Sequence, residues 1–245
     1  MVQNSFIFNT RVDNLKKQDI FRIIDDSLQS DSFHQIATIN PEFLLLARKN
    51  SAFRDILNGC DLNVSDGVGV HVAFWRQGER LWARMAGADL MAYILQQAQE
   101  KHLSVMCIIR KDGLSIWKDI RRALKKFYPT LHVEGMDIGH AMSIDMLRAE
   151  TQQRISGSNI LLCNFGVPYQ EVFLAGLRKN QSAIRVAMGV GGSFDFLTGK
   201  LKRAPKWMRD TGLEWLWRLL LQPKRFKRIW KAVVIFPLRV ILRIK

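Results

Sequence analysis

The sequence has few cysteines and no long apolar segment. Its three cysteines, Cys60, Cys107 and Cys163, lie far apart in apolar surroundings and form no C-x-x-C pair, so a metal or redox site of that kind is not expected. We expect buried, reduced thiols, as in a cytoplasmic protein. The first seventeen residues have no continuous apolar region behind a basic start, so we expect no secretory signal there.

The common nucleotide and metal motifs are also missing. No G-x-x-x-x-G-K-[ST] occurs, which excludes a P-loop, and no G-x-G-x-x-G heads the first strand–helix unit, which ranks an NAD-dependent enzyme last. Neither a D-x-D pair nor H-E-x-x-H is present. We therefore expect no obligate metal and no cofactor.

Positive charge is concentrated at the C-terminal end. From Lys200 onward, fourteen basic residues stand against Asp210 and Glu214, which places +12 of the net charge of +15 in this part of the chain. Such a charge implies an anionic partner: a nucleic acid, an anionic membrane or a phosphorylated substrate. We expect two parts, an α/β core over residues 1–200 and a basic helical appendage over residues 201–245.

The appendage is amphipathic. Beyond Pro223, five apolar side chains recur at helical spacing, while five basic residues occupy the other faces. The apolar positions are Phe226, Ile229, Trp230, Val233 and Val234. The uninterrupted apolar stretch 232–238 contains Pro237 and is far shorter than the roughly 20 residues that span a membrane. We expect a helix that lies on an anionic membrane surface; the alternative is a helix that packs its apolar face on the core.

Short apolar runs alternate with amphipathic stretches through the rest of the chain. This alternation is typical of an α/β fold with a mostly parallel, Rossmann-like sheet flanked by helices. The expected strands are Gln35–Thr38, Leu62–Val64, Ser104–Ile109, His132–Met136, Ile160–Cys163 and Ile184–Gly189. The expected helices are Pro41–Gly59, Ala88–Lys101, Leu114–Phe127, Ile144–Ile155 and Tyr169–Arg178.

Ligands of such sheets bind at the carboxyl ends of the strands, so the turns after the strands are the candidate site. Thr38 and Asn40 lie in the first turn, where Asn40 could instead cap a helix. Asp66 follows the second strand in D-G-V-G-V; it is a candidate general base, or alternatively an Asx-turn or helix cap. Arg84 and Asp89 flank a glycine turn and could form a surface ion pair.

Two later turns complete the set. Gln170 lies in the first helical turn after G-V-P, where backbone N–H groups can hold an anion. Gly191 and Gly192 follow the last expected strand in a glycine-rich turn. Each turn by itself is a weak signal.

Together, in their order, the turns are specific. The succession T-I-N-P-E, D-G-V-G-V, R-M-A-G-A-D-L, G-V-P-Y-Q-E, G-V-G-G-S-F-D-F-L-T-G-K-L-K-R-A-P-K-W and G-L-E-W-L-W-R-L closely resembles the WecG/TagA/CpsF glycosyltransferases, glycosyltransferase family 26. The resemblance covers residues 38–228. It implies an inverting transfer of N-acetylmannosamine, its uronic acid or a related sugar. The donor would be a UDP-sugar and the acceptor a polyprenyl-diphosphate-linked saccharide, in bacterial surface polysaccharide synthesis.

The resemblance also assigns roles. Asp66 matches the proposed catalytic base, and Thr38, Asn40 and Gln170 match positions that line the same pocket. Four arginines resemble the cations that the family brings over the active site, where they would neutralise diphosphate without a metal: Arg84, Arg218, Arg225 and Arg228. We expect a cytoplasmic enzyme bound peripherally to the inner face of the membrane, allow for a homo-oligomer, and expect no nucleic acid as a partner.

The chain departs from the family pattern in two turns. Residues 110–113 read R-K-D-G where the family usually has a G-G-x-P-G type turn, and Tyr169 replaces the lysine of the usual P-K-Q-E. The runner-up function is a nucleic-acid-binding protein with a basic C-terminal arm. Against it, the basic residues of the arm alternate with Leu, Val and Ile rather than with exposed Gly, Ser and aromatic residues.

Overall fold

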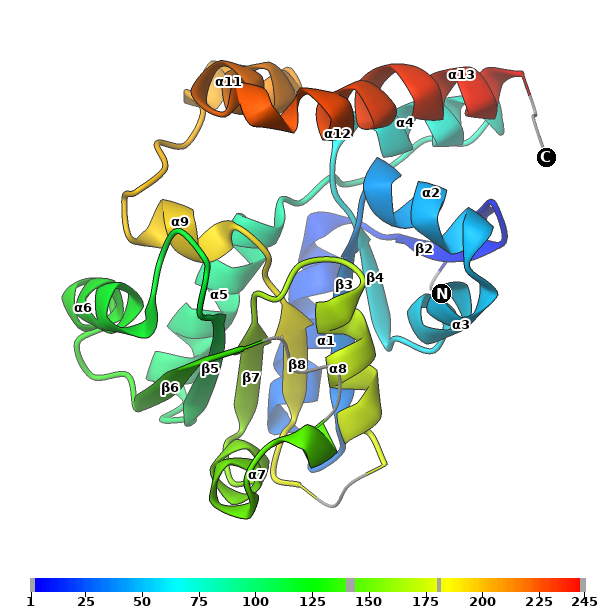
Figure 1. The fold of residues 1–245 in the computed structure, drawn as a ribbon. Coiled ribbons are helices and arrows are strands. Elements are labelled where there is room, and N and C mark those ends of the chain that lie inside the picture. The colour runs from blue at the N-terminus through cyan, green and yellow to red at the C-terminus, as the bar shows by residue number, and fades with distance from the viewer. Residues whose placement is uncertain (1–2, 140–143, 180–181, 243–245) are drawn as a thin grey trace.

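A mixed β-sheet forms the centre of the computed structural model, which describes residues 3–139, 144–179 and 182–242 (Figure 1). Within these residues the sheet has eight strands in the order β1-β2-β4-β3-β8-β7-β5-β6, parallel except for the β1–β2 hairpin at one edge. The strands are β1 Gln3–Ile7, β2 Thr10–Asn14, β3 His34–Ile39, β4 Leu62–Ser65, β5 Val105–Arg110, β6 Val133–Ile138, β7 Ile160–Cys163 and β8 Val186–Gly189. The expected α/β class and all six expected strands are confirmed.

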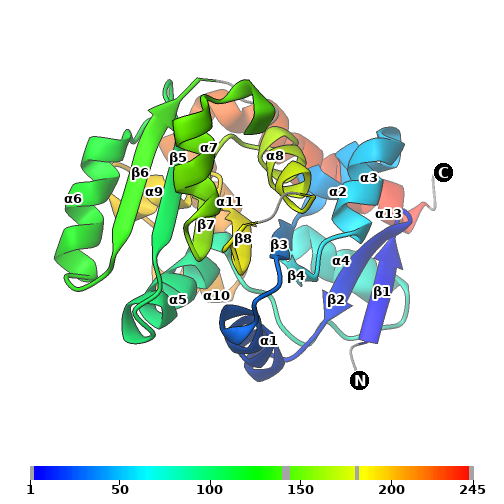
Figure 2. The same cartoon turned by 90° about the horizontal axis from the view of Figure 1, so that it is seen from below.

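Helices connect the strands and cover both faces of the sheet (Figure 2). The helices of the core are α1 Lys17–Gln29, α2 Pro41–Lys49, α3 Ser51–Asn58, α4 Val68–Arg76, α5 Gly87–Glu100, α6 Trp117–Phe127, α7 Ala149–Ser156, α8 Tyr169–Leu177 and the short α9 Ser193–Leu197, with a 3-10 turn, η1, at Ile144–Met146. The hairpin, α1, α4 and α9 were not among the expected elements.

Two expected helices were too long. The stretch 41–59 is interrupted at Asn50, whose backbone is extended and whose side chain caps α3 by accepting a bond from the Phe53 N–H at 3.1 Å. An Asn side chain that satisfies a free helical N–H stabilises a new helix start. The stretch 144–155 likewise divides into η1 and α7.

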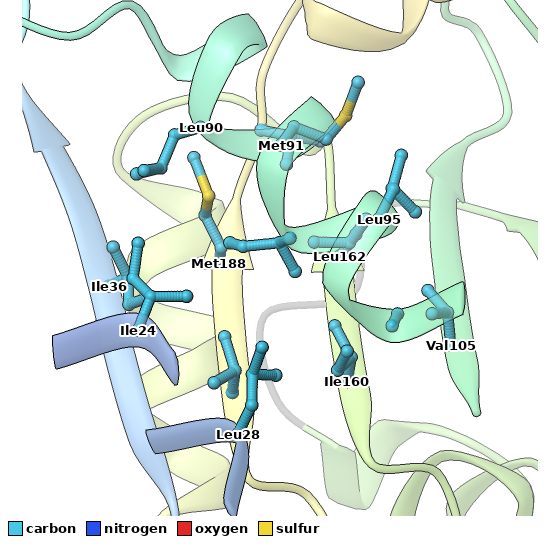
Figure 3. Packing of buried hydrophobic residues seen from close by; sticks show 14 of the residues in the cluster. Ile24, Leu28, Ile36, Leu90, Met91, Leu95, Val105, Ile160, Leu162 and Met188 are labelled. Atoms are coloured by element: carbon cyan, nitrogen blue, oxygen red, sulfur yellow. The ribbon is translucent and has the colours of Figure 1, made fainter. Parts of the chain in front are cut away.

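The core follows from the alternation of side chains along buried strands. On β5, Val105, Cys107 and Ile109 belong to one buried cluster, and Met106 and Ile108 belong to another. Both faces are apolar because successive side chains point to opposite faces and both faces are covered. Figure 3 shows the first cluster, in which Leu28 of α1 and Leu95 of α5 pack on the sheet.

The C-terminal residues form a chain of helices across the carboxyl edge of the sheet (Figure 1). These are α10 Lys206–Asp210, α11 Glu214–Leu221, η2 Pro223–Arg225, α12 Phe226–Trp230, the π-helical turn η3 Lys231–Ile235 and α13 Phe236–Ile241. Pro237 continues the helix rather than ending it. A proline ring clashes with the carbonyl four residues before it, and the wider π turn directly ahead of Pro237 relieves this conflict.

One side of this tail packs on the core. Phe236 is completely buried in a cluster with Phe8, Phe43 and Phe74, so part of the alternative interpretation, a helix packed on the core, is correct. Phe226 and Trp230, two of the five positions predicted to form the apolar face, are 54% and 48% exposed. Among the described helices, none has the length and apolar character needed to cross a bilayer.

Candidate active site

The predicted turns meet at one edge of the sheet. Strands β4, β3, β8 and β7 are neighbours, and their parallel pairing aligns Ile39 with Ser65 and Cys163 with Gly189. The turns that follow these strands therefore lie side by side. The order of the strands also reverses here, since β4 lies on one side of β3 and the later strands lie on the other. Open α/β sheets bind their ligands at such a point.

Asp66 lies directly beyond the end of β4. Its backbone N–H donates to the Ile39 carbonyl at 2.7 Å, which ties the turn to β3. Gly67, with φ of 88°, occupies the cap position of α4 without a side-chain cap bond, so Asp66 does not cap the helix that follows it. Its carboxyl group instead accepts a hydrogen bond from the N–H of Gly87, the first residue of α5.

The electrostatic surroundings of Asp66 suit a proton acceptor. Burial, with a smaller contribution from the Glu214 carboxylate, raises the pKa of Asp66 to about 6 against the opposing effects of Arg218, Arg84 and a hydrogen bond from the Gly87 N–H. A base of this pKa is mostly ionised at neutral pH and more basic than an exposed carboxylate, as general base catalysis requires.

Thr38 and Ser193 lie beside Gly87, the residue that donates to Asp66. A Cβ on Gly87 would stand 3.3 Å from Thr38 Oγ1 and 3.8 Å from Ser193 Oγ. The two hydroxyl groups are thus close together at this strand edge. Asn40 lies in the same turn and is the N-cap of α2, accepting from the Glu42 N–H at 2.9 Å, so its helix-cap interpretation is confirmed.

Gln170 is buried beneath the site. Its Oε1 accepts bonds from the Gly166 and Gly191 N–H groups at 3.0 and 3.3 Å, and its Nε2 donates to Glu171 Oε1 at 2.7 Å. The amide therefore joins the turn after β7 to the turn after β8. Burial raises the pKa of Glu171 to about 8, so this carboxyl group holds its proton at neutral pH.

The tail brings cations to the same edge. Arg84 donates to the Arg209 carbonyl at the end of α10. The Arg218 guanidinium lies 4.9 Å from the centroid of the Phe196 ring and 3.5 Å from Glu214. The alternative interpretation of Arg84 and Asp89 as an ion pair is wrong, because Asp89 accepts its two close hydrogen bonds from Arg203, at 2.5 and 2.7 Å.

Arg225 and Arg228 extend this cationic group. Burial first, and then repulsion from Arg228 and Arg218, lowers the pKa of Arg225. Arg228 forms an ion pair with Glu42 at 2.6 Å. A narrow cleft of about 10 Å³ separates Gly192 and Phe196 from Arg218 and Arg225. That volume holds about one water molecule, so the tail packs closely against the turn after β8 at this point.

The structure thus gathers Asp66, Thr38, Arg84 and Arg218 at one strand edge, and Gly192 and Arg225 line a cleft together with Arg218. Gln170 is engaged with backbone groups and Arg228 with Glu42. Sequence reasoning missed Ser193, Phe196 and Glu214. All three lie inside the two sequence blocks that carried the family resemblance, but nothing in the sequence indicated which of their residues face Asp66.

The described residues contain no group of three or more His, Cys, Asp or Glu side chains that could hold a metal ion. Cys60, Cys107 and Cys163 are free and buried, as expected. The positive charge facing Asp66 comes from arginines, which bind phosphate oxygens with paired N–H donors.

A mostly parallel α/β sheet with a buried strand-end carboxylate and nearby arginines is an arrangement typical of an enzyme active site. A sequence model of the protein family described as "Glycosyl transferase WecG/TagA/CpsF family" matches residues 6–245. The chain belongs to this family and is a glycosyltransferase.

Two similar proteins carry the same name, N-acetylglucosaminyldiphosphoundecaprenol N-acetyl-beta-D-mannosaminyltransferase. The protein from Bacillus subtilis (strain 168) is 30% identical over 195 residues, which cover 79% of this chain and 74% of the relative. The protein from Bacillus spizizenii (strain ATCC 23059 / NRRL B-14472 / W23) is 32% identical over 196 residues, with the same coverage.

Proposed function

We propose that this glycosyltransferase moves N-acetylmannosamine, its uronic acid or a related sugar from a UDP donor to a polyprenyl-diphosphate-linked saccharide in the synthesis of a bacterial surface polysaccharide. The names of the two Bacillus relatives support the acceptor class and the amino sugar. The observation that carries the proposal is Asp66, a carboxylate with a pKa of about 6 that faces arginines from the tail.

In the proposed reaction, Asp66 removes the proton from the acceptor hydroxyl group as its oxygen attacks the anomeric carbon. The bond from that carbon to the UDP oxygen breaks on the opposite face, so the configuration inverts and UDP leaves with the bonding electron pair. One base on the acceptor side is sufficient for this displacement. Arg84, Arg218 and Arg225 neutralise the charge that develops on the diphosphate.

The hydroxyl and amide groups of the strand edge would orient the two substrates. We assign Thr38 and Asn40, with Ser193 beside them, to the sugar and acceptor hydroxyl groups. Gln170 would act through the backbone, by holding the turns at Gly166 and Gly191 at a fixed separation. A sugar nucleotide is far larger than the cleft of about 10 Å³ between the tail and the turn after β8, and we propose that the tail moves outward when the donor binds.

Membrane association would place the tail against the lipid-linked acceptor. Several large apolar side chains of the tail are exposed: Trp207, Leu220, Leu221, Phe226, Trp230, Leu238, Ile241 and Leu242. The basic residues Lys224, Lys227 and Lys231 are exposed among them. This combination favours an anionic membrane face. We propose that residues 201–245 act as a distinct unit that docks on the cytoplasmic face and closes over residues 1–200.

The experiment is a panel of UDP-sugars incubated with a polyprenyl-diphosphate-linked N-acetylglucosamine acceptor and scored by product mass. We expect one N-acetylmannosamine-type donor to give product. Asp66→Asn, which keeps the size of the side chain but cannot accept the proton, should reduce turnover by about 10²- to 10⁴-fold. Asp66→Asn with unchanged turnover and a normal melting temperature would remove the assigned base, and absence of product with every donor would overturn the proposed substrates.

A further inference from the structure

A second cationic site lies away from Asp66, beside the end of the tail. It is a cavity of about 1150 Å³ between the tip of the β1–β2 hairpin, the ends of α2 and α4, α3 and α13. Figures 1 and 2 both show the hairpin, α2, α3 and α13 gathered on one side of the molecule. Its lining includes five cationic residues, Arg48, Lys49, Arg54, Arg76 and Arg239, and no acidic residue among the described positions. We call this cavity the lateral groove.

Two side-chain bonds to the backbone fix the walls of the lateral groove. Gln77 Nε2 donates to the Phe6 carbonyl at 2.7 Å, which holds the hairpin against α4. Arg76 Nε donates to the Ile241 carbonyl at 3.4 Å, which holds α13 against the same helix. Segments from both ends of the chain therefore meet in a fixed arrangement, and the groove is a built feature of the fold.

The chemistry of the groove selects an anion. Its cations carry hydrogen-bond donors only, and its other polar side chains are the amides of Asn9 and Gln77, so few acceptors are available for sugar hydroxyl groups or base edges. Ile7, Ala73 and Val240 supply an apolar part of the lining. A group with phosphate oxygens joined to aliphatic carbon matches both features.

The position of the groove points to a lipid. Arg239 lies on α13 between Leu238, Ile241 and Leu242, which are 47%, 45% and 62% exposed. Apolar side chains that enter a bilayer would hold this helix at the depth of the lipid phosphates, where basic residues are attracted to anionic headgroups. Single-stranded nucleic acid would instead need aromatic platforms. The one aromatic ring in the lining, Phe8, is occupied by Arg48 and Phe236, with centres 5.4 and 5.8 Å away.

We propose that the lateral groove binds the phosphate headgroup of an anionic membrane phospholipid and so orients the enzyme on the bilayer. The site is separate from the tail arginines that face Asp66. The inference rests on the membrane association included in the proposed function, but not on the identity of either sugar substrate.

The test compares the full chain with the variant Arg54→Gln/Arg239→Gln in co-sedimentation with vesicles, at one salt concentration. Glutamine keeps much of the aliphatic stem and removes the charge. On vesicles that contain phosphatidylglycerol we expect about 25-fold weaker binding, because each basic residue near the surface contributes roughly a factor of five. Binding to pure phosphatidylcholine vesicles and turnover of a short-chain, water-soluble acceptor should not change.

The matched control is Arg121→Gln/Arg122→Gln, which removes the same charge from exposed positions on α6. An equal loss of binding in this control would overturn the proposal, because net charge alone would then explain the effect. Unchanged phosphatidylglycerol binding by Arg54→Gln/Arg239→Gln would also overturn it. If Arg54→Gln/Arg239→Gln keeps its vesicle binding but loses affinity for inorganic phosphate or for an oligonucleotide, the groove binds that other anion and the proposal is overturned.

The lateral groove can fail independently of the proposed function. Asp66→Asn should bind phosphatidylglycerol vesicles as the unchanged chain does, since Asp66 does not line the groove. If no UDP-sugar gives product while Arg54→Gln/Arg239→Gln loses vesicle binding, the lipid site stands and the substrates are wrong. If product forms and the double variant binds vesicles normally, the substrates stand and the lipid site is wrong.

Discussion

The strands that lead to the candidate site are buried, whereas the tail that faces their ends has little buried surface. The strands that carry the turns of Asp66 and Gly191 are buried on both faces, and all four residues of β4 and of β8 are buried. In the tail, by contrast, α11, η2, α12 and η3 contain no buried residue, and α13 contributes only Phe236. The proposed base therefore follows a fully buried strand, whereas the tail arginines Arg218 and Arg228 lie on helices without a buried residue.

This difference provides a way to couple binding to closure. A helix with little buried surface loses little free energy when it moves away. Arginines on that helix recover binding energy when a diphosphate arrives, so a negatively charged donor would draw the tail back over Asp66. The three predictions that follow test the two halves of this comparison, from the largest expected effect to the smallest.

Arg218→Gln should have the largest effect. The guanidinium lies over Phe196 and reduces the pKa of Asp66, so its loss removes charge stabilisation at the reacting centre. We expect kcat to fall roughly 10²- to 10³-fold. Steady-state kinetics measure this effect, with Arg121→Gln on α6 as a control for loss of charge. Equal kinetics in the two variants would separate Arg218 from the chemistry.

Gly69→Ala should weaken the contact between tail and core. A Cβ at this position would stand 2.5 Å from Pro41 Cγ, so α2 or α4 must shift, and 3.2 Å from the Ala232 carbonyl oxygen, so the tail must also move by a few tenths of an ångström. Overpacking of this kind costs about 1–3 kcal/mol. We expect roughly tenfold lower turnover and faster proteolysis within residues 201–245.

The control for Gly69→Ala is Gly176→Ala on α8, where a Cβ meets nothing within 4 Å. Alanine at an exposed helical position should raise stability by about 0.5–1 kcal/mol and leave turnover unchanged. Equal effects of the two substitutions on turnover would show that the closed position of the tail is unimportant.

Glu171→Gln should have the smallest effect and should change a pH dependence. Burial raises the pKa of Glu171 to about 8, so the native state keeps a proton that the unfolded chain releases at about pH 4.3. The free energy of unfolding should therefore fall as the pH rises from about 4.3 through about 8. A glutamine cannot ionise and should flatten this fall, as measured by urea unfolding between about pH 6.5 and 8.5. Equal slopes in both proteins would contradict a protonated Glu171.

Six strands of the sheet could be predicted from the sequence because they are short apolar runs between turn residues. The N-terminal hairpin was missed because Phe8 and Asn9 form its turn with positive φ, and Phe-Asn lacks the usual Asn-Gly or Asp-Gly signal. That omission matters, since the hairpin forms one wall of the lateral groove. No local pattern could place Arg54 of α3 beside Arg239 of α13.

The candidate site was readable in part. Parallel strands end at one edge, so polar residues after them were expected to converge, and Asp66, Thr38 and Gly192 do. The hydrogen-bond partners of the side chains could not be predicted from the sequence. Gln170 was predicted to bind substrate, yet its amide oxygen accepts hydrogen bonds from the Gly166 and Gly191 N–H groups. Whether a side chain faces substrate or backbone depends on how distant segments pack together, and the spacing of residues along the sequence carries no information about that packing.

The central claim is that Asp66 and the tail arginines act as one site. The most direct test is the pH dependence of kcat/KM in the unchanged enzyme and in Arg218→Gln. Turnover should rise with pH through about 6 as Asp66 ionises. Because Arg218 lowers the pKa of Asp66, its removal should move this limb to higher pH. A limb that stays in place in Arg218→Gln would contradict the account, since Asp66 would then titrate without the tail.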